Sequence, residues 1–169
     1  MAYEKLQGYL ALEAIPSDQA NIPYPALLMT GQTTAVGKAI PTPGVPMEDA
    51  NGGFETTNKV YAGDIVYFAA QQRAATVIDV ISDTELVLNN AAGQAASQDY
   101  VIYQASSYLN LQDANNGCVL YVGGSGDLKV DTISGSTVTF KAVPIGFFPV
   151  QVKKVYGTGT NASSIIALW

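Results

Sequence analysis

Residues 117–169 read GCVLYVGGSGDLKVDTISGSTVTFKAVPIGFFPVQVKKVYGTGTNASSIIALW, and this stretch decides the fold class. Its β-branched and aromatic residues gather in five short runs, and the intervening turns are rich in glycine, serine and proline. These runs predict strands at about 118–122, 128–132, 137–143, 148–156 and 164–168. Because the stretch lacks the period of an amphipathic helix, it is typical of a compact antiparallel sandwich or barrel.

The glycines of Gly123-Gly124-Ser125-Gly126 raise the question of a phosphate-binding loop. Such a loop needs a Lys followed by Ser or Thr, or a third glycine and then a helix, and neither follows here. Instead Leu128, Val130 and Thr132 alternate with charged residues, which is the pattern of a half-buried strand. We therefore predict a tight hairpin turn, in which glycine supplies the positive φ that such turns require.

The rest of the chain divides into two further parts. Residues 59–108 contain the runs VYAGDIVYFAA, AATVIDVISDTELVLN and DYVIYQA, which predict a small antiparallel β unit ahead of the unit at 109–169. Residues 1–58 differ in composition, because six of the eight prolines of the chain lie in the first 46 residues. Proline fixes φ and removes a backbone donor, so this segment is expected to be an extended arm with little regular structure. The predicted fold is all-β, with an extended Pro-rich arm and one or two small antiparallel barrels or sandwiches.

The predicted arm carries apolar side chains that are costly to leave in water. We expect them to lie against the body of the protein or against a neighbouring subunit, and tyrosine suits such contacts. The candidate interface residues are Tyr3, Leu6, Tyr9, Leu10, Ile15, Ile22, Tyr24, Leu27, Leu28 and Met29. Trp169, at the end of the run IIALW, is predicted to be a core or oligomer-interface anchor.

The composition argues against several classes of function. The chain has no His, which removes the usual nucleophilic triads and most zinc sites, and neither a cofactor nor a metal is expected. A net charge of −6 argues against direct binding of nucleic acid, and the apolar runs are too short for a membrane span. The single cysteine, Cys118, is predicted to be a small buried apolar residue. Carboxylate pairs remain possible at Glu48-Asp49 and Asp83/Glu85. Both pairs lie in turn-like contexts, which rarely provide the partly desolvated cleft that acid–base catalysis needs, so an enzyme is the least favoured class.

Two parts of the chain resemble proteins of tailed bacteriophages. Residues 63–103, GDIVYFAAQQRAATVIDVISDTELVLNNAAGQAASQDYVIY, resemble a module of phage structural proteins, especially marine and cyanobacterial ones. Residues 117–169, with LYVGGxGD, VTFxxVPxG, PxQVxxVxxxGT and IIALW in that order, resemble the small β domain of phage virion proteins and of head-spike base proteins of gene transfer agents. The segment PSDQANIPYPALL, residues 16–28, is similar to the start of such phage proteins.

The resemblance implies a particle component without catalysis. The expected function is that of a capsid decoration (cement) protein, made in the bacterial cytoplasm, which binds the exterior of the head shell and stabilises it. Its expected partners are the major capsid protein and further copies of itself, as a trimer in preference to a pentamer. The alternative is a head-spike base or tail appendage for host attachment, which would bind a host glycan.

Overall fold

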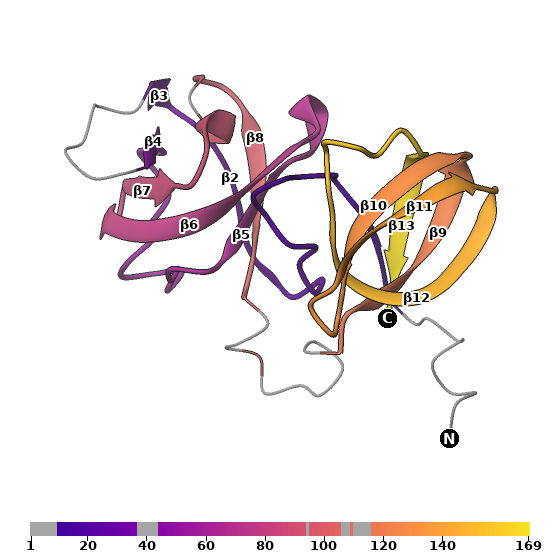
Figure 1. Ribbon diagram of the computed structural model, residues 1–169. Helices are drawn as coiled ribbons and strands as arrows, with labels where there is room; N and C mark the ends of the chain where they lie inside the picture. The colour runs from indigo at the N-terminus through magenta and orange to yellow at the C-terminus, as the bar shows by residue number, and fades with distance from the viewer. Residues whose placement is uncertain (1–9, 37–43, 94, 106–108, 110–115) are drawn as a thin grey trace. The chain divides into compact units, whose positions relative to one another are not determined.

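A computed structural model describes residues 10–36, 44–93, 95–105, 109 and 116–169 (Figure 1). The chain forms two compact units that are interleaved in sequence. The first, here called the terminal unit, combines Met1–Pro25 with Leu109–Trp169, and the second, the inserted unit, is Ala26–Tyr108. The chain therefore begins one unit, completes another, and then returns to finish the first.

The terminal unit is built on one antiparallel six-stranded sheet. Its strands are β1 (Ala11–Glu13), β9 (Cys118–Gly124), β10 (Gly126–Thr132), β11 (Thr137–Val143), β12 (Gly146–Val155) and β13 (Ser163–Leu168). Their order across the sheet is β1-β13-β9-β12-β10-β11. The five C-terminal strands that the sequence predicts are confirmed, with bounds that differ by at most two residues.

The core of the terminal unit lies on one face of this sheet. Alternate residues of β9 and β10, such as Leu120, Val122, Leu128 and Val130, are fully buried, as period-two side-chain alternation requires. In the described residues of this unit no helix covers the sheet, so the strands curve around their own core (Figure 1). Ile22, from the segment that follows β1, adds to this core.

The glycine-rich connection between β9 and β10 is not a hairpin, which corrects the prediction. The two strands do not pair, because β12 lies between them and Val152 is the register partner of both Cys118 and Thr132. The glycines here serve close approach rather than positive φ. A Cβ on Gly123 would lie 2.7 Å from the Cβ of Ser164, and one on Gly126 would lie 2.6 Å from the backbone nitrogen of Ala162. Only glycine lets the chain pass so near to the start of β13 and the residues just before it.

The inserted unit has a seven-stranded antiparallel sheet. Its strands are β2 (Leu27–Gln32), β3 (Ala35–Val36), β4 (Val45–Glu48), β5 (Ile65–Phe68), β6 (Arg73–Ser82), β7 (Glu85–Leu88) and β8 (Asp99–Tyr103), with 3-10 turns η2 (Ala69–Gln71) and η3 (Ala91–Gly93). Their order is β2-β8-β5-β6-β7-β4-β3. The long strand β6 pairs with β5 through its first half and with β7 through its second half. Irregularities after Val77 and Val80 bend it, so its two halves serve different parts of the sheet.

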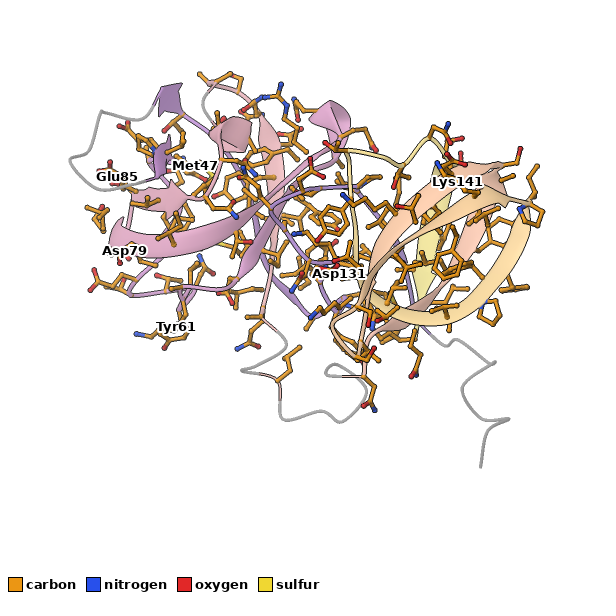
Figure 2. All side chains as sticks on the ribbon, in the orientation of Figure 1. Met47, Tyr61, Asp79, Glu85, Asp131 and Lys141 are labelled. Atoms are coloured by element: carbon orange, nitrogen blue, oxygen red, sulfur yellow. The ribbon has the colours of Figure 1, made fainter. Side chains whose placement is uncertain are left out.

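The inserted unit has its own core, in which a hydrogen-bonded polar pair is buried. Met47 on β4, labelled in Figure 2, and Phe68 on β5 are fully buried in this core. The Tyr100 hydroxyl donates to Oδ2 of Asp49 at 2.6 Å, and the Asn51 backbone N–H donates to Oδ1 at 2.8 Å. Burial and the neighbouring Asp49 carboxylate raise the pKa of Tyr100 far above its usual range, so its proton stays in this bond.

An all-β fold is confirmed, but closed barrels are not. Within the described residues each sheet is open, with β1 and β11 at the edges of one and β2 and β3 at the edges of the other. An extended Pro-rich arm is not shown. β1 pairs with β13, whereas β2, β3 and β4 belong to the inserted sheet. The described part of the chain contains no helix that is long and apolar enough to cross a membrane.

Candidate functional site: an apolar outer face on the terminal sheet

The terminal sheet has apolar side chains on its outer face as well as in its core. Tyr121 on β9 is the register partner of Phe147 on β12 and of Ile166 on β13, so these three side chains share one row. They face away from the core, because the neighbours of Tyr121 in β9, Leu120 and Val122, are buried inside. We call Val119, Tyr121, Phe147, Ile166 and Leu168 of the sheet, together with the exposed Ile145 of the turn that leads into β12, the outer face.

The outer face is open to solvent at its centre. Phe147 is 71% exposed, Ile145 62% and Tyr121 37%. The rings of Tyr121 and Phe147 pack edge to face, with centroids 5.7 Å apart and an interplanar angle of 74°. Large apolar side chains that gather on a surface in this way often mark an interaction site, whereas single exposed apolar residues are ordinary.

The local sequence explains why Phe147 points outward. The turn before β12 is Pro144-Ile145, and Gly146, the first residue of β12, adopts a φ of 137°, a conformation that side-chain-bearing residues rarely take. Two consecutive phenylalanines follow Gly146 in β12, and alternation places Phe148 in the core and Phe147 on the opposite face. Because consecutive residues point to opposite faces, two adjacent phenylalanines make both faces of the strand apolar.

The structure places the predicted interface residues in several different environments. Tyr3, Leu6 and Tyr9 lie outside the described residues. Ile15, Ile22, Tyr24 and Met29 are buried, Leu10, Leu28 and Trp169 are half-buried, and Leu27 is 61% exposed. The structure therefore does not gather the described members of this set on one surface. Trp169 packs against the terminal core, with its ring edge to face with that of Tyr24 at 5.6 Å.

Sequence reasoning missed the outer face, although a signal was present. The runs CVLYV, GFFPV and SIIALW carry apolar residues at odd and even positions alike, whereas a half-buried strand alternates apolar and polar residues. Such continuous runs are typical of strands that are covered on both faces. In the terminal unit the core covers one face of these strands, and the other face is open to solvent.

Two side chains that could in principle take part in chemistry, those of Cys118 and Asp83, are buried or hydrogen-bonded within the fold. Cys118 is buried, as predicted, and burial raises the pKa of its thiol to about 12, which keeps it protonated. Of the carboxylates weighed above as a possible pair, Asp83 accepts the backbone N–H groups of Glu55 and Thr56 at 2.9 and 2.7 Å. Among the residues that the structure describes, no three His, Cys, Asp or Glu side chains cluster so as to hold a metal ion.

The inserted unit has an open hollow that offers less as a binding site. It has a volume of about 670 Å³ and is lined by Thr30, Gly31, Gln32, Tyr67, Ala69, Ala70, Asp99, Tyr100 and Val101. At its rim the Gln32 amide donates to Asp99 Oδ1 at 2.7 Å. Its two tyrosines are almost wholly buried, so their ring faces are not available to stack on a sugar.

One exposed carboxylate ties the segment after β1 to the rest of the terminal unit. Asp18 Oδ2 accepts the Thr158 hydroxyl at 2.5 Å and Oδ1 accepts the Thr158 backbone N–H at 2.9 Å. These two bonds lower the pKa of Asp18 below its usual value of 3.8. The Lys154 ammonium donates to the Asp18 backbone carbonyl at 2.7 Å from the same side of the chain.

We expect Asp18→Asn to destabilise the protein at neutral pH but much less in acid. The folded pKa of Asp18 lies below the unfolded value, so its stabilisation is complete above the unfolded pKa of 3.8 and is lost as pH falls through the folded pKa. Urea unfolding of both proteins at about pH 6 and about pH 3 measures this. A difference in unfolding free energy that stays constant between the two pH values would contradict the assignment.

Comparisons with family models, with curated proteins and with solved structures returned no match for this chain. The case for a function therefore rests on the residues themselves. In the described part, the outer face of the terminal sheet is the feature that most clearly exceeds what folding alone requires.

Proposed function

We propose that this protein is a non-catalytic structural component of a tailed-phage particle, which decorates the outer surface of the head shell and stabilises it. The single observation that carries the proposal is the exposed aromatic pair Tyr121–Phe147 on an otherwise compact β unit. It supports a role in assembly through protein–protein contacts, because apolar rings left in water are a cost that such contacts remove. The resemblance of residues 117–169 to the β domain of phage virion proteins supports the assignment to a phage particle.

The construction of the two units suits such a role. Each unit has its own buried core and a hydrogen-bonded sheet, which together resist local opening and proteolysis. Several links between consecutive strands of the terminal unit are short, such as the single Ser125 between β9 and β10. A protein that remains on a particle outside the cell needs this kind of rigidity more than it needs moving parts.

The test is co-sedimentation of the purified protein with head shells of the virus that encodes it, assembled without this protein. We expect saturable binding of many copies per shell, with unlabelled protein competing for the same sites. We also expect the bound shells to withstand heating or low ionic strength better than bare shells. Binding of about one oligomer per vertex would instead favour the head-spike base, and no binding to shells would overturn the decoration role.

A further inference from the structure

We propose that the outer face of the terminal sheet is a contact between copies of this chain. Its occupant is then the same face of a second copy, with Phe147 of one copy packed against the aromatic pair of the other. This inference goes beyond the proposed function, since it applies to the protein in solution and does not require a head shell.

Charge favours a second copy over a partner with a charged surface. The six side chains of the outer face carry no charge, and the nearest charged side chain in the register is Glu13 on β1, opposite Ile166. A charged partner group pressed against Phe147 would lose its hydration without gaining an opposite charge. An identical face brings no charge to be buried, and it lets two copies of a chain with net charge −6 meet without opposing carboxylates at the centre of the contact.

The size of the face is in the range of a modest self-contact. Taken with the exposed fractions of Phe147, Ile145 and Tyr121, side-chain areas of about 150–250 Å² give roughly 300–400 Å² of exposed apolar surface per copy. That lies within the range of about 300–600 Å² for the largest apolar patch on a typical monomer, which is often functional, and it is about half of the ~800 Å² that each partner buries in a standard interface. We therefore expect the face to form the apolar centre of the contact, with polar neighbours as its rim, and dissociation constants in the micromolar range.

Phe147 is the side chain on which the contact depends most. It is the most exposed large apolar residue in the described chain, at 71%, and it projects beside Tyr121 rather than into the core. Interfaces concentrate their binding energy in a few such aromatic anchors. Because most of its surface is already in water, a change to serine removes the anchor with little loss of packing inside the unit.

Sedimentation velocity of the full chain from about 1 to 200 μM tests the proposal, since that range brackets micromolar association. The wild type is compared with Phe147→Ser and with the matched control Ile133→Ser, which removes a 40% exposed isoleucine from the turn after β10, outside the outer face. We expect the wild type and Ile133→Ser to form dimers, since a face that packs on its own copy is satisfied by one partner, and Phe147→Ser to raise the dissociation constant at least about tenfold. Thermal unfolding of all three proteins separates loss of contact from loss of fold.

Two results would overturn the inference. One is a wild-type chain that stays monomeric throughout, and the other is an oligomer that Phe147→Ser leaves intact. If the chain is monomeric but Phe147→Ser abolishes co-sedimentation with shells, the face belongs to the shell contact and the copy-to-copy contact is rejected. If the chain oligomerises through Phe147 but binds no shell, the inference stands and the proposed function fails.

Discussion

Residues 116–169 alone are expected to remain unfolded, whereas the same residues followed by an Asn-Gly turn and residues 10–25 are expected to fold as an independent domain. The reason is that the terminal unit is discontinuous in the chain. Its sheet includes β1, and its core includes Ala14 and Ile22, all of which precede the inserted unit. A fragment that begins after the inserted unit lacks these parts.

The missing contacts are large on the scale of a small domain. The fragment loses the β1–β13 pairing, the burial of Ile22 and the edge-to-face contact of Tyr24 with Trp169. Each fully buried large side chain contributes about 1.5–3 kcal/mol, and a domain of this size has only several kcal/mol in total. Loss of two such side chains and a strand is therefore expected to abolish folding.

The permuted order restores the contacts with a short turn. Leu10 and Trp169 are already paired, since the backbone N–H of each donates to the carbonyl of the other, at 3.4 Å for Leu10 and 3.1 Å for Trp169. β13 and β1 run antiparallel there, so a two-residue Asn-Gly turn can join them as a hairpin. Circular dichroism and the dispersion of amide proton shifts report folding. A control with residues 10–25 in scrambled order should stay unfolded, and a folded 116–169 fragment would show that these contacts are dispensable.

Gly31→Ala is expected to destabilise the inserted unit by about 2–4 kcal/mol, because it disrupts a buried polar pair. A Cβ on Gly31 would overlap the Tyr100 hydroxyl and lie 2.6 Å from Asp49 Oδ2. The Tyr100–Asp49 hydrogen bond would have to open, and both groups are buried away from water. An uncompensated buried carboxylate is among the more costly defects in a core.

The matched control for Gly31→Ala is Gly157→Ala. Gly157 is exposed, its φ is not in the positive range, and an added Cβ would meet its nearest atom, the Pro16 carbonyl oxygen, at an ordinary 3.6 Å. We expect this change to alter the free energy of unfolding by no more than about 0.5 kcal/mol. Urea unfolding, followed by tyrosine and tryptophan fluorescence, measures both. If Gly31→Ala is as mild as Gly157→Ala, the Tyr100–Asp49 pair is not held as tightly as the structure indicates.

Local sequence predicted the strands well because it determines which residues favour extended, half-buried backbone. Alternation in LKVDT and the apolar run CVLYV placed β10 and β9 within a few residues of their true bounds. The partners of those strands were predicted wrongly. A glycine-rich link of one to four residues usually makes a hairpin, but here the core packing draws β12 between β9 and β10. Strand order depends on contacts between distant residues, which no local pattern records.

The candidate site likewise depends partly on local sequence and partly on contacts between distant residues. Apolar residues at both parities in β9, β12 and β13 were visible in the sequence, yet only the register that brings Tyr121 beside Phe147 and Ile166 turns them into one surface. The prolines of residues 16–46 predicted an irregular arm. Tertiary pairing instead places β2, β3 and β4 in the inserted sheet as edge and near-edge strands, and Pro46 lies in the near-edge β4, where the cost of a missing backbone donor is small.

The sequence by itself determined that this protein is all-β, that Cys118 is buried, and that the chain has no histidine with which to build a triad. These properties follow from composition and from the period-two pattern, which act over a few residues. Tertiary structure alone decided that the first and last strands share a sheet, that a second unit is inserted between them, and that three strands meet in one exposed aromatic face. The physical reason is that burial of apolar surface is non-directional and long-range in sequence, so the pairing that removes most of it from water is a property of the whole chain.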